Sequence, residues 1–125
     1  MPDGLVLFAH GARDPRWAEP FERLRERVAR DTPETRVMLA YLELMAPDLD
    51  VAVQELCAGG CGTVVVVPVF LGQGGHVRDD VTVLLRDVAA RHPHCRFRLA
   101  RAAGEDAAVL DAIASYCLRQ LAAER

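Results

Sequence analysis

Continuous apolar runs alternate with amphipathic stripes from one end of the chain to the other. The run from Gly4 to Ala9 has no polar interruption, which is typical of a strand buried on both faces of a sheet. Four consecutive valines between Thr63 and Pro68 predict a central strand, since β-branched side chains favour that conformation. Further strands are predicted at residues 36–44 and 95–100, the last being less apolar and therefore nearer an edge.

The segments between and after these strands have helical spacing. Asp14 and Pro15 supply an N-cap and a first-position proline for the first helix, and Pro47 opens the second. Gly59 and Gly60 end that second helix, as glycines commonly do. The apolar stripes of the four predicted helices are Trp17, Phe21, Leu24 and Val28; Leu49, Val53 and Leu56; Val77, Val81, Leu84, Leu85 and Val88; and Val109, Leu110, Ile113, Cys117 and Leu121.

The resulting order, βαβαβαβα, predicts one α/β domain over residues 1–125. Parallel strands need covering crossover helices, so we expect a flavodoxin-like, three-layer α/β/α fold with a four-stranded parallel sheet. A sheet of four strands is small. A second copy of the chain is therefore expected to cover its edges or one of its helical faces.

The composition is that of a folded protein, and it limits the classes of partner that the protein is expected to bind. Of the 125 residues, 51% are hydrophobic and 26% are charged, ordinary values for a soluble domain with a core. Eighteen acidic residues against fifteen basic ones, all arginine, give a net charge of −3, which supports neither a nucleic-acid nor a membrane partner. No stretch approaches the roughly 20 apolar residues of a membrane span, and Met1 to Gly4 lacks the positive region of a signal peptide. A cytoplasmic location is expected.

The cysteines and the single serine are not expected to carry the chemistry. Cys57 and Cys61 are four residues apart, but no second close pair completes a zinc-type ligand set. Cys95 falls in a predicted strand and Cys117 on the apolar face of the last helix. All four are predicted to be reduced and structural, with a redox role as the alternative. Ser115 lies inside the last helix, so a serine nucleophile has no support.

Three metal-competent side chains are predicted at the carboxyl ends of the strands, where open α/β sheets bind their ligands. His10 follows the first strand, Glu43 ends the second, and His76 closes the glycine-rich loop after the third. They are spaced 33 residues apart, so three units of equal length are expected to bring them to one edge. Two imidazoles and a carboxylate are a common ligand set for a first-row divalent metal. His92 and His94 flank a proline at the opposite edge and are predicted to face solvent.

Each of these residues also has a simpler interpretation. A histidine after a strand often serves only as a hydrogen-bonding residue, and Glu43 could be a paired structural carboxylate. The glycine-rich loop from Gly72 to Gly75 could merely permit a tight turn. This loop lacks the lysine of a Walker motif and does not fit the dinucleotide fingerprint, which argues against a nucleotide-binding module.

The same segments resemble a known family. Leu7 to Pro15 resembles the HGSRDP segment of the small class II tetrapyrrole chelatases of the CbiX/SirB type, with Ala12 in place of the usual serine. Residues 66–71, followed by Gly74 to Asp80, are similar to that family's second signature, and Tyr41 to Leu44 matches its middle segment. The resemblance covers essentially the whole chain in the expected order. The missing hydroxyl at Ala12 is expected to tune the site rather than to abolish it.

The resemblance implies a metal chelatase, a lyase that inserts a divalent metal into sirohydrochlorin on the route to cobalamin or sirohaem. The metal is then a substrate, cobalt first and otherwise iron or nickel, and no organic cofactor is expected. In that family the histidines matching His10 and His76 bind the metal, and the glutamate matching Glu43 lies in the same site. Its short members are homodimers of one-domain chains. The alternative is a carrier that binds the metal or the tetrapyrrole without catalysing insertion.

Three arginines next to these loops are candidates for binding the substrate. Arg13, Arg16 and Arg78 could pair with the peripheral carboxylates of a tetrapyrrole, because a guanidinium binds a carboxylate in a bidentate manner. Solvated loop charges are the alternative. In the mechanism that we expect, the two histidines hold the metal over the ring face, and the glutamate completes the site or receives protons from the pyrroles.

Overall fold

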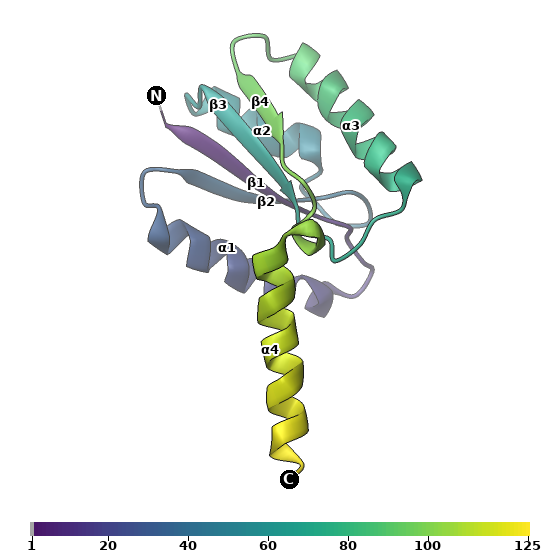
Figure 1. Ribbon diagram of the computed structural model, residues 1–125. Coiled ribbons are helices and arrows are strands. Elements are labelled where there is room, and N and C mark those ends of the chain that lie inside the picture. Colours follow the sequence, from purple (N-terminus) through teal and green to yellow (C-terminus); the bar gives the residue numbers. More distant parts are fainter. Residues whose placement is uncertain (1) are drawn as a thin grey trace.

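A computed structural model describes residues 2–125 and shows a four-stranded parallel sheet with helices on both faces (Figure 1). Met1 belongs to the N-terminal segment that is predicted not to be a signal peptide, and it lies outside the described residues. The strands are β1 (Asp3–Ala9), β2 (Arg36–Tyr41), β3 (Thr63–Pro68) and β4 (Arg96–Leu99), in the order β2-β1-β3-β4. The helices are α1 (Glu19–Asp31), α2 (Leu49–Ala58), α3 (Gly75–Ala90) and α4 (Ala107–Ala123), with 3-10 turns η1 (Pro15–Ala18) and η2 (Ala103–Glu105). The predicted fold class is confirmed, and β4 is an edge strand as expected.

The helix ends follow the local signals in the sequence. The Asp14 side chain accepts a hydrogen bond from the backbone N–H of Arg16 at 2.9 Å, so it caps η1, and α1 follows directly. Asp48 caps α2 by accepting from the N–H of Val51 at 2.9 Å, so the helix begins at Leu49, two residues later than an opening at Pro47 predicts. Gly59 caps the other end of α2, as predicted.

The main core lies between the sheet and the helices α2 and α3. Alternate residues of the two central strands point into it and are fully buried: Val6, Phe8, Val64 and Val66. They pack against Leu49, Val53 and Leu56 of α2 and Val81, Leu85 and Val88 of α3. Since the two central strands bury one face so completely, the carboxyl ends of β1 and β3 are held rigidly side by side.

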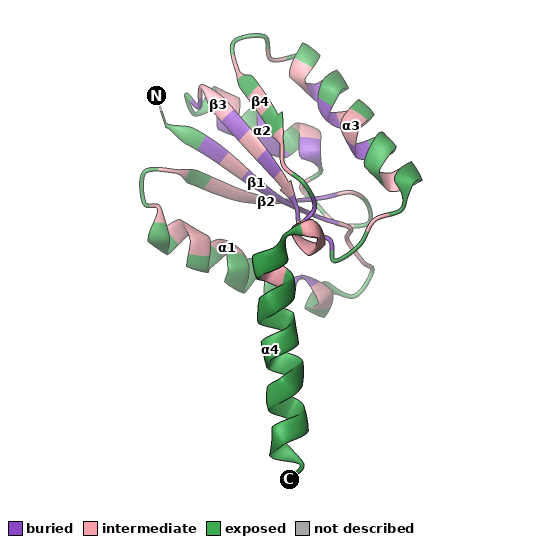
Figure 2. Ribbon diagram, viewed as in Figure 1, coloured by how far each residue is buried: buried purple, intermediate pink, exposed green. Residues whose placement is uncertain are grey.

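The other face of the sheet is covered only in part. α1 lies against β2 and β1, where Trp17 and Phe21 pack on the buried Tyr41. α4 projects away from the body, and none of its residues is buried (Figures 1 and 2). The predicted apolar stripe of α4 is present, but contrary to expectation it does not lie on the sheet, so Cys117 is exposed rather than packed. Between residues 2 and 125, no helix has the length and hydrophobicity to cross a bilayer.

Candidate functional site

The register of the sheet decides which residues meet beyond its carboxyl edge. β1 pairs with β2 through Ala9 and Tyr41, so two residues further on Gly11 is level with Glu43. β1 pairs with β3 through Phe8 and Pro68, so His10 is level with Phe70. The chain leaves β1 toward one side of the sheet and leaves β3 toward the other. The gap between these two strands is therefore the switch point at which open α/β sheets bind ligands.

His10 is held in place by an aromatic neighbour. Its imidazole stacks on the ring of Phe70, with centroids 4.1 Å apart and planes inclined by 21°. Phe70 is only 2% exposed and also contacts the ring of Phe8 in the core. The chain after β3 continues to pair with β1, since the N–H of Val69 donates to the carbonyl of Phe8 at 2.7 Å. One face of the half-buried imidazole is thus packed on the buried ring of Phe70, and the opposite face is turned away from the core.

The backbones of the first and second loops are joined directly. The N–H of Glu43 donates to the carbonyl of His10 at 3.0 Å. Gly11 has a φ of +92°, and a Cβ built there would lie 1.8 Å from the carbonyl oxygen of Glu43. The carboxylate of Glu43 is exposed. It forms no ion pair within residues 2–125, so the structural-carboxylate interpretation finds no partner there.

His76 lies at the same edge of the sheet but stands apart from the other two residues. It occupies the first turn of α3, six residues beyond the position level with His10. Its side chain is 91% exposed, and its Nε2 lies 3.3 Å from a carboxylate oxygen of Asp80. Across the part of the chain that the structure describes, no three histidine, cysteine or acidic side chains converge as a metal site. The equal spacing of 33 residues therefore brings two of the three residues together and leaves the third on a neighbouring helix.

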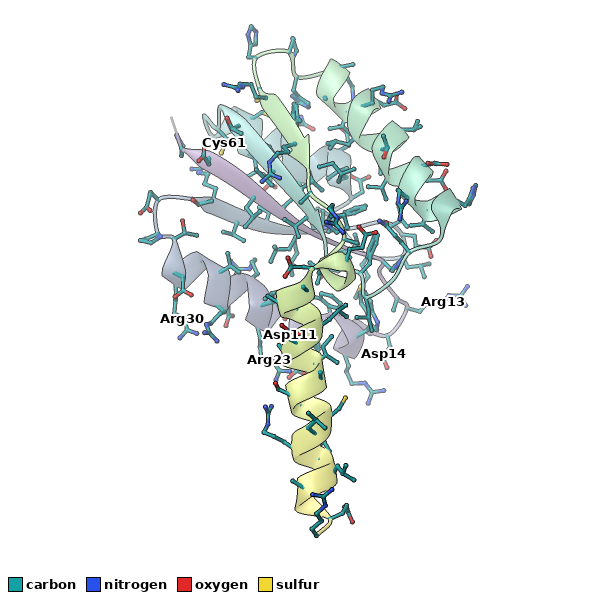
Figure 3. All side chains as sticks on the ribbon, viewed as in Figure 1. Arg13, Asp14, Arg23, Arg30, Cys61 and Asp111 are labelled. Carbon is teal, nitrogen blue, oxygen red and sulfur yellow. The ribbon has the colours of Figure 1, made fainter. Side chains whose placement is uncertain are left out.

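Two of the three candidate arginines already have carboxylate partners. Arg16 pairs with Asp14 at 2.7 Å, and this guanidinium lowers the pKa of the Asp14 carboxyl. Arg78 lies 3.1 Å from Glu105, which stands just before α4. Arg13 is exposed, points outward from the loop after β1 and makes no ion pair within residues 2–125 (Figure 3). Of the three guanidiniums, that of Arg13 is thus available without breaking an existing pair.

Apolar side chains surround this edge of the sheet. Leu44, after β2, is 59% exposed, and Leu71, after β3, is 66% exposed. Beside Phe70 lies a hollow of about 340 Å³ between the loop after β3, α1 and the base of α4, with Phe21, Leu71 and Ile113 among its lining residues. Large exposed apolar side chains grouped near polar ones commonly mark a binding surface.

The opposite edge of the sheet holds three of the cysteines and the two remaining histidines. Cys57, Cys61 and Cys95 line a hollow of about 320 Å³ together with His92 and His94. Burial, followed by a hydrogen bond with Cys95, raises the pKa of the Cys57 thiol to about 12. All four cysteines of the chain are free thiols, but Cys117 is exposed, so the prediction that every one of them is a packed structural residue is wrong for Cys117. Figure 3 shows Cys61 at the far edge from Arg13, so this group is separate from the candidate site.

Two residues of the site were not predicted to act there. Phe70 could have been found from the register, because a large aromatic residue two positions after β3 falls level with His10. Glu105 gave no signal, since its role depends on Arg78 and Arg101, which are brought to it from α3 and from the end of β4. The hydrogen bond from Arg101 is the main cause that lowers the pKa of Glu105.

Comparison with known proteins gives consistent results. The family model for CbiX matches residues 4–119. The sirohydrochlorin cobaltochelatase of Sulfolobus acidocaldarius is 26% identical over 97% of this chain and 94% of its own length. The enzyme of the same name from Methanopyrus kandleri is 33% identical over 65% of this chain and 57% of its own length.

Solved structures share the fold. The CbiX protein of Marinobacter aquaeolei VT8, whose name refers to cobalamin (vitamin B12) biosynthesis, has a TM-score of 0.85 and 34% identity over 96% of this chain and 98% of that chain. SirB from Bacillus subtilis, solved with Fe³⁺, has a TM-score of 0.79 but 22% identity, and this chain spans 46% of it. The similarity to SirB, at 22% identity, shows a shared fold and nothing more. The match over residues 4–119 shows that the chain belongs to the CbiX family.

Proposed function

We propose that the chain is a sirohydrochlorin chelatase, a lyase that inserts a divalent metal ion into this tetrapyrrole. The family membership and the shared name of the curated relatives support this reaction. The structural observation that carries the proposal is the pairing at the switch point. There, His10 is fixed on Phe70 and its backbone is bonded to that of Glu43. The backbone bond thereby holds an imidazole-bearing residue next to a carboxylate-bearing one, at the sheet edge where the fold binds ligands.

The proposed roles follow from how firmly each group is held. Metal insertion requires that the ion exchange its water and that two pyrrole N–H groups lose their protons. His10, stacked on Phe70, serves as the fixed ligand, because imidazole binds Co²⁺, Fe²⁺ and Ni²⁺ and releases them by exchange. The exposed Glu43 accepts a proton or completes the coordination. His76, exposed on the first turn of α3, reaches the ion from the other side of the switch point.

The macrocycle is proposed to lie on the apolar side chains at this edge. Leu44 and Leu71 are both exposed there and offer a surface for a flat ring. Arg13 is the first candidate to bind a peripheral carboxylate. Arg16 and Arg78 can do the same by exchanging their present partners for the substrate.

The remaining features of the proposal come from the family and from the length, composition and charge of the chain. The metal is a substrate, with cobalt the first candidate because of the relatives' names, and with iron and nickel as alternatives. The chain works as one domain over residues 1–125, as a homodimer in the cytoplasm, without an organic cofactor, a nucleic acid or a membrane. The tetrapyrrole belongs to cobalamin or sirohaem synthesis.

The test is anaerobic metallation of sirohydrochlorin followed by absorbance, with Co²⁺, Fe²⁺ and Ni²⁺ offered separately. His10→Ala, His76→Ala and Glu43→Gln are compared with His94→Ala, which removes an exposed histidine at the opposite edge. We expect turnover above the spontaneous rate in the wild type and His94→Ala, and a loss of roughly a hundredfold or more in His10→Ala. Wild-type activity in His76→Ala would remove that residue from the mechanism.

A non-catalytic carrier is the second candidate, because the same ligands would serve it. Multiple-turnover kinetics separate the two. A carrier stops at one equivalent of product or shows binding of the metal or pigment with no rate enhancement, whereas a chelatase continues until substrate is exhausted.

A further inference from the structure

Three of the four cysteines meet at the amino end of the sheet, on the edge opposite the candidate site. Cys57 lies near the end of α2, Cys61 lies two residues before β3, and Cys95 directly precedes β4. Together they line a hollow of about 320 Å³, with His92 and His94 also in its wall. The proposed metal chemistry uses none of these residues, and across residues 2–125 no three such side chains converge as a metal site. They form a group of nucleophilic side chains without an assigned role.

Hydrogen bonds bring two of the three thiols together. The chain pairs β4 with the segment before β3, since the N–H of Arg96 donates to the carbonyl of Gly62 at 2.9 Å. This pairing places the thiol of Cys95 where it donates to the carbonyl of Cys61 at 3.3 Å. The side chains of Cys57 and Cys95 are also hydrogen-bonded to each other. The two thiols are therefore neighbours in space, although they lie 38 residues apart in the sequence.

The other two cysteines are placed differently. Cys61 is only 3% exposed and belongs to the main core, where its Sγ would lie 3.3 Å from a Cβ built on Gly4 of β1. Cys117 is exposed on α4, which follows the carboxyl end of β4 and projects away from the body (Figure 1). Cys57 and Cys95 are half-buried and line the hollow. They are thus the pair of thiols that is both in contact and open to a small molecule in solution.

We propose that Cys57 and Cys95 are a site of reversible oxidation, at which a small-molecule disulfide that enters the hollow converts the two thiols into an intramolecular disulfide. Permanent disulfides are rare in reducing compartments, but thiol pairs that are oxidised and reduced again do occur there. This redox role is independent of the metal chemistry at the other edge of the sheet. It adds to the chain a modification site that the proposed chelatase reaction does not need.

The oxidation takes place in two steps of thiol–disulfide exchange. The thiolate of Cys95 attacks one sulfur of the small disulfide, whose S–S bond breaks and releases one thiol, and a mixed disulfide remains on Cys95. Cys57 then loses its proton to solvent and attacks the Cys95 sulfur, which releases the second thiol. Two electrons pass from the protein to the small disulfide, and the two protons end on the released thiols. Cys95 attacks first because burial, followed by the hydrogen bond with Cys95, raises the pKa of Cys57 and keeps that thiol protonated.

The disulfide would join two elements that are otherwise held separately. α2 packs on β1, β2 and α3, whereas β4 is held by β3 and α3. A link between Cys57 and Cys95 ties the end of α2 to the start of this edge strand and closes a loop that contains β3 and α3. Because a cross-link restricts the unfolded chain, the oxidised protein is expected to be more stable than the reduced one.

The first experiment equilibrates the full chain with mixtures of reduced and oxidised glutathione, followed by alkylation, mass spectrometry and peptide mapping. We expect two of the four thiols to be lost together, in a link between Cys57 and Cys95 of one chain. Folding holds these thiols together, so the link should form at an oxidised glutathione concentration about tenfold or more below that needed in denaturing urea. Retention of all four thiols, a link that includes Cys61 or Cys117, or equal concentrations in the folded and unfolded chain would overturn the proposal.

The second experiment measures thermal unfolding of the oxidised and reduced forms of three variants. Cys57→Ser and Cys95→Ser each remove one thiol of the pair, and Cys117→Ser removes an exposed thiol elsewhere as the matched control. Oxidation is expected to raise the unfolding temperature of the wild type and of Cys117→Ser by about 5 °C or more. It should leave the other two variants unchanged. An oxidised wild type that is no more stable than the reduced protein, or a similar rise in Cys95→Ser, would contradict the proposed link.

Discussion

The loops after β1 and β2 meet at Gly11 and Glu43, where a Cβ on Gly11 would lie 1.8 Å from the carbonyl oxygen of Glu43. The close approach is possible because Gly11 has no side chain and adopts a φ of +92°. It also fixes where the two candidate ligands stand, since His10 precedes the glycine and its carbonyl accepts from Glu43.

Gly11→Ala is therefore expected to damage both stability and the site. A positive φ alone costs a residue with a Cβ about 1 kcal/mol, and the collision with Glu43 adds about 2 kcal/mol more. Gly60→Ala is the matched control, because Gly60 has a φ of +95° and nothing within 4 Å of its Cβ position. Urea unfolding of the two variants measures the difference. Equal free energies of unfolding would mean that the loops separate without cost.

Phe70→Leu is expected to disturb the position of the His10 imidazole while changing the stability of the fold only slightly. The leucine keeps the buried site apolar but removes the ring on which His10 rests, so metal insertion should slow while unfolding changes by about 1 kcal/mol. Phe97→Leu removes a ring that packs against the same core without touching His10. We expect this control to retain the wild-type rate. A similar loss of rate in both variants would show that the stack has no specific role.

The two ion pairs that Glu105 forms with Arg78 and Arg101, just before α4, are expected to weaken in acid. Arg101 first, and Arg78 after it, lower the pKa of Glu105, so this carboxylate contributes stability above the usual glutamate pKa and loses it as the pH falls through the lowered value. Carboxyl NMR titration should show a larger upward shift of the Glu105 pKa in Arg101→Gln than in Arg78→Gln. Between about pH 6 and about pH 3 the unfolding midpoint of Glu105→Gln should fall less than that of the wild type. The reverse order of the two arginine variants would contradict this assignment.

Cys57 is expected to make the protein sensitive to alkali. Its pKa is raised to about 12, so the folded state favours the neutral thiol, and that stability is lost as the pH rises from the usual thiol value toward 12. Urea midpoints measured from about pH 8 to about pH 10 should decline more steeply in the wild type than in Cys57→Ala. Cys117→Ala, which removes an exposed thiol, serves as the control and should follow the wild type.

Local patterns were sufficient to predict the elements. Runs such as Gly4 to Ala9 and the valines of β3 place strands because their side chains must leave water on both faces of a sheet. Asp14 and Gly59 mark helix ends because their effects act within a few residues of backbone. Both the strand count and the α/β class follow from such short-range preferences.

The candidate site was predicted in part for the same reason. The positions of His10 and Glu43 at strand ends can be read from the sequence, but their contact depends on strand register, which long-range pairing sets. Phe70 beneath His10 is likewise a product of register. The expected meeting of His76 with these residues is not found within residues 2–125 of the structure, since six further residues carry it onto α3.

The sequence by itself thus determined four strands, four helices and the edge of the sheet where the chemistry lies, because those follow from the solubility and turn preferences of neighbouring residues. Only the tertiary structure decided how the loops interlock and where α4 points. The apolar stripe of that helix predicts burial but cannot specify the partner, since hydrophobic association has no direction. The direction comes from Gly104 and Glu105, whose contacts exist only once the loop after β3 and the end of β4 are in place.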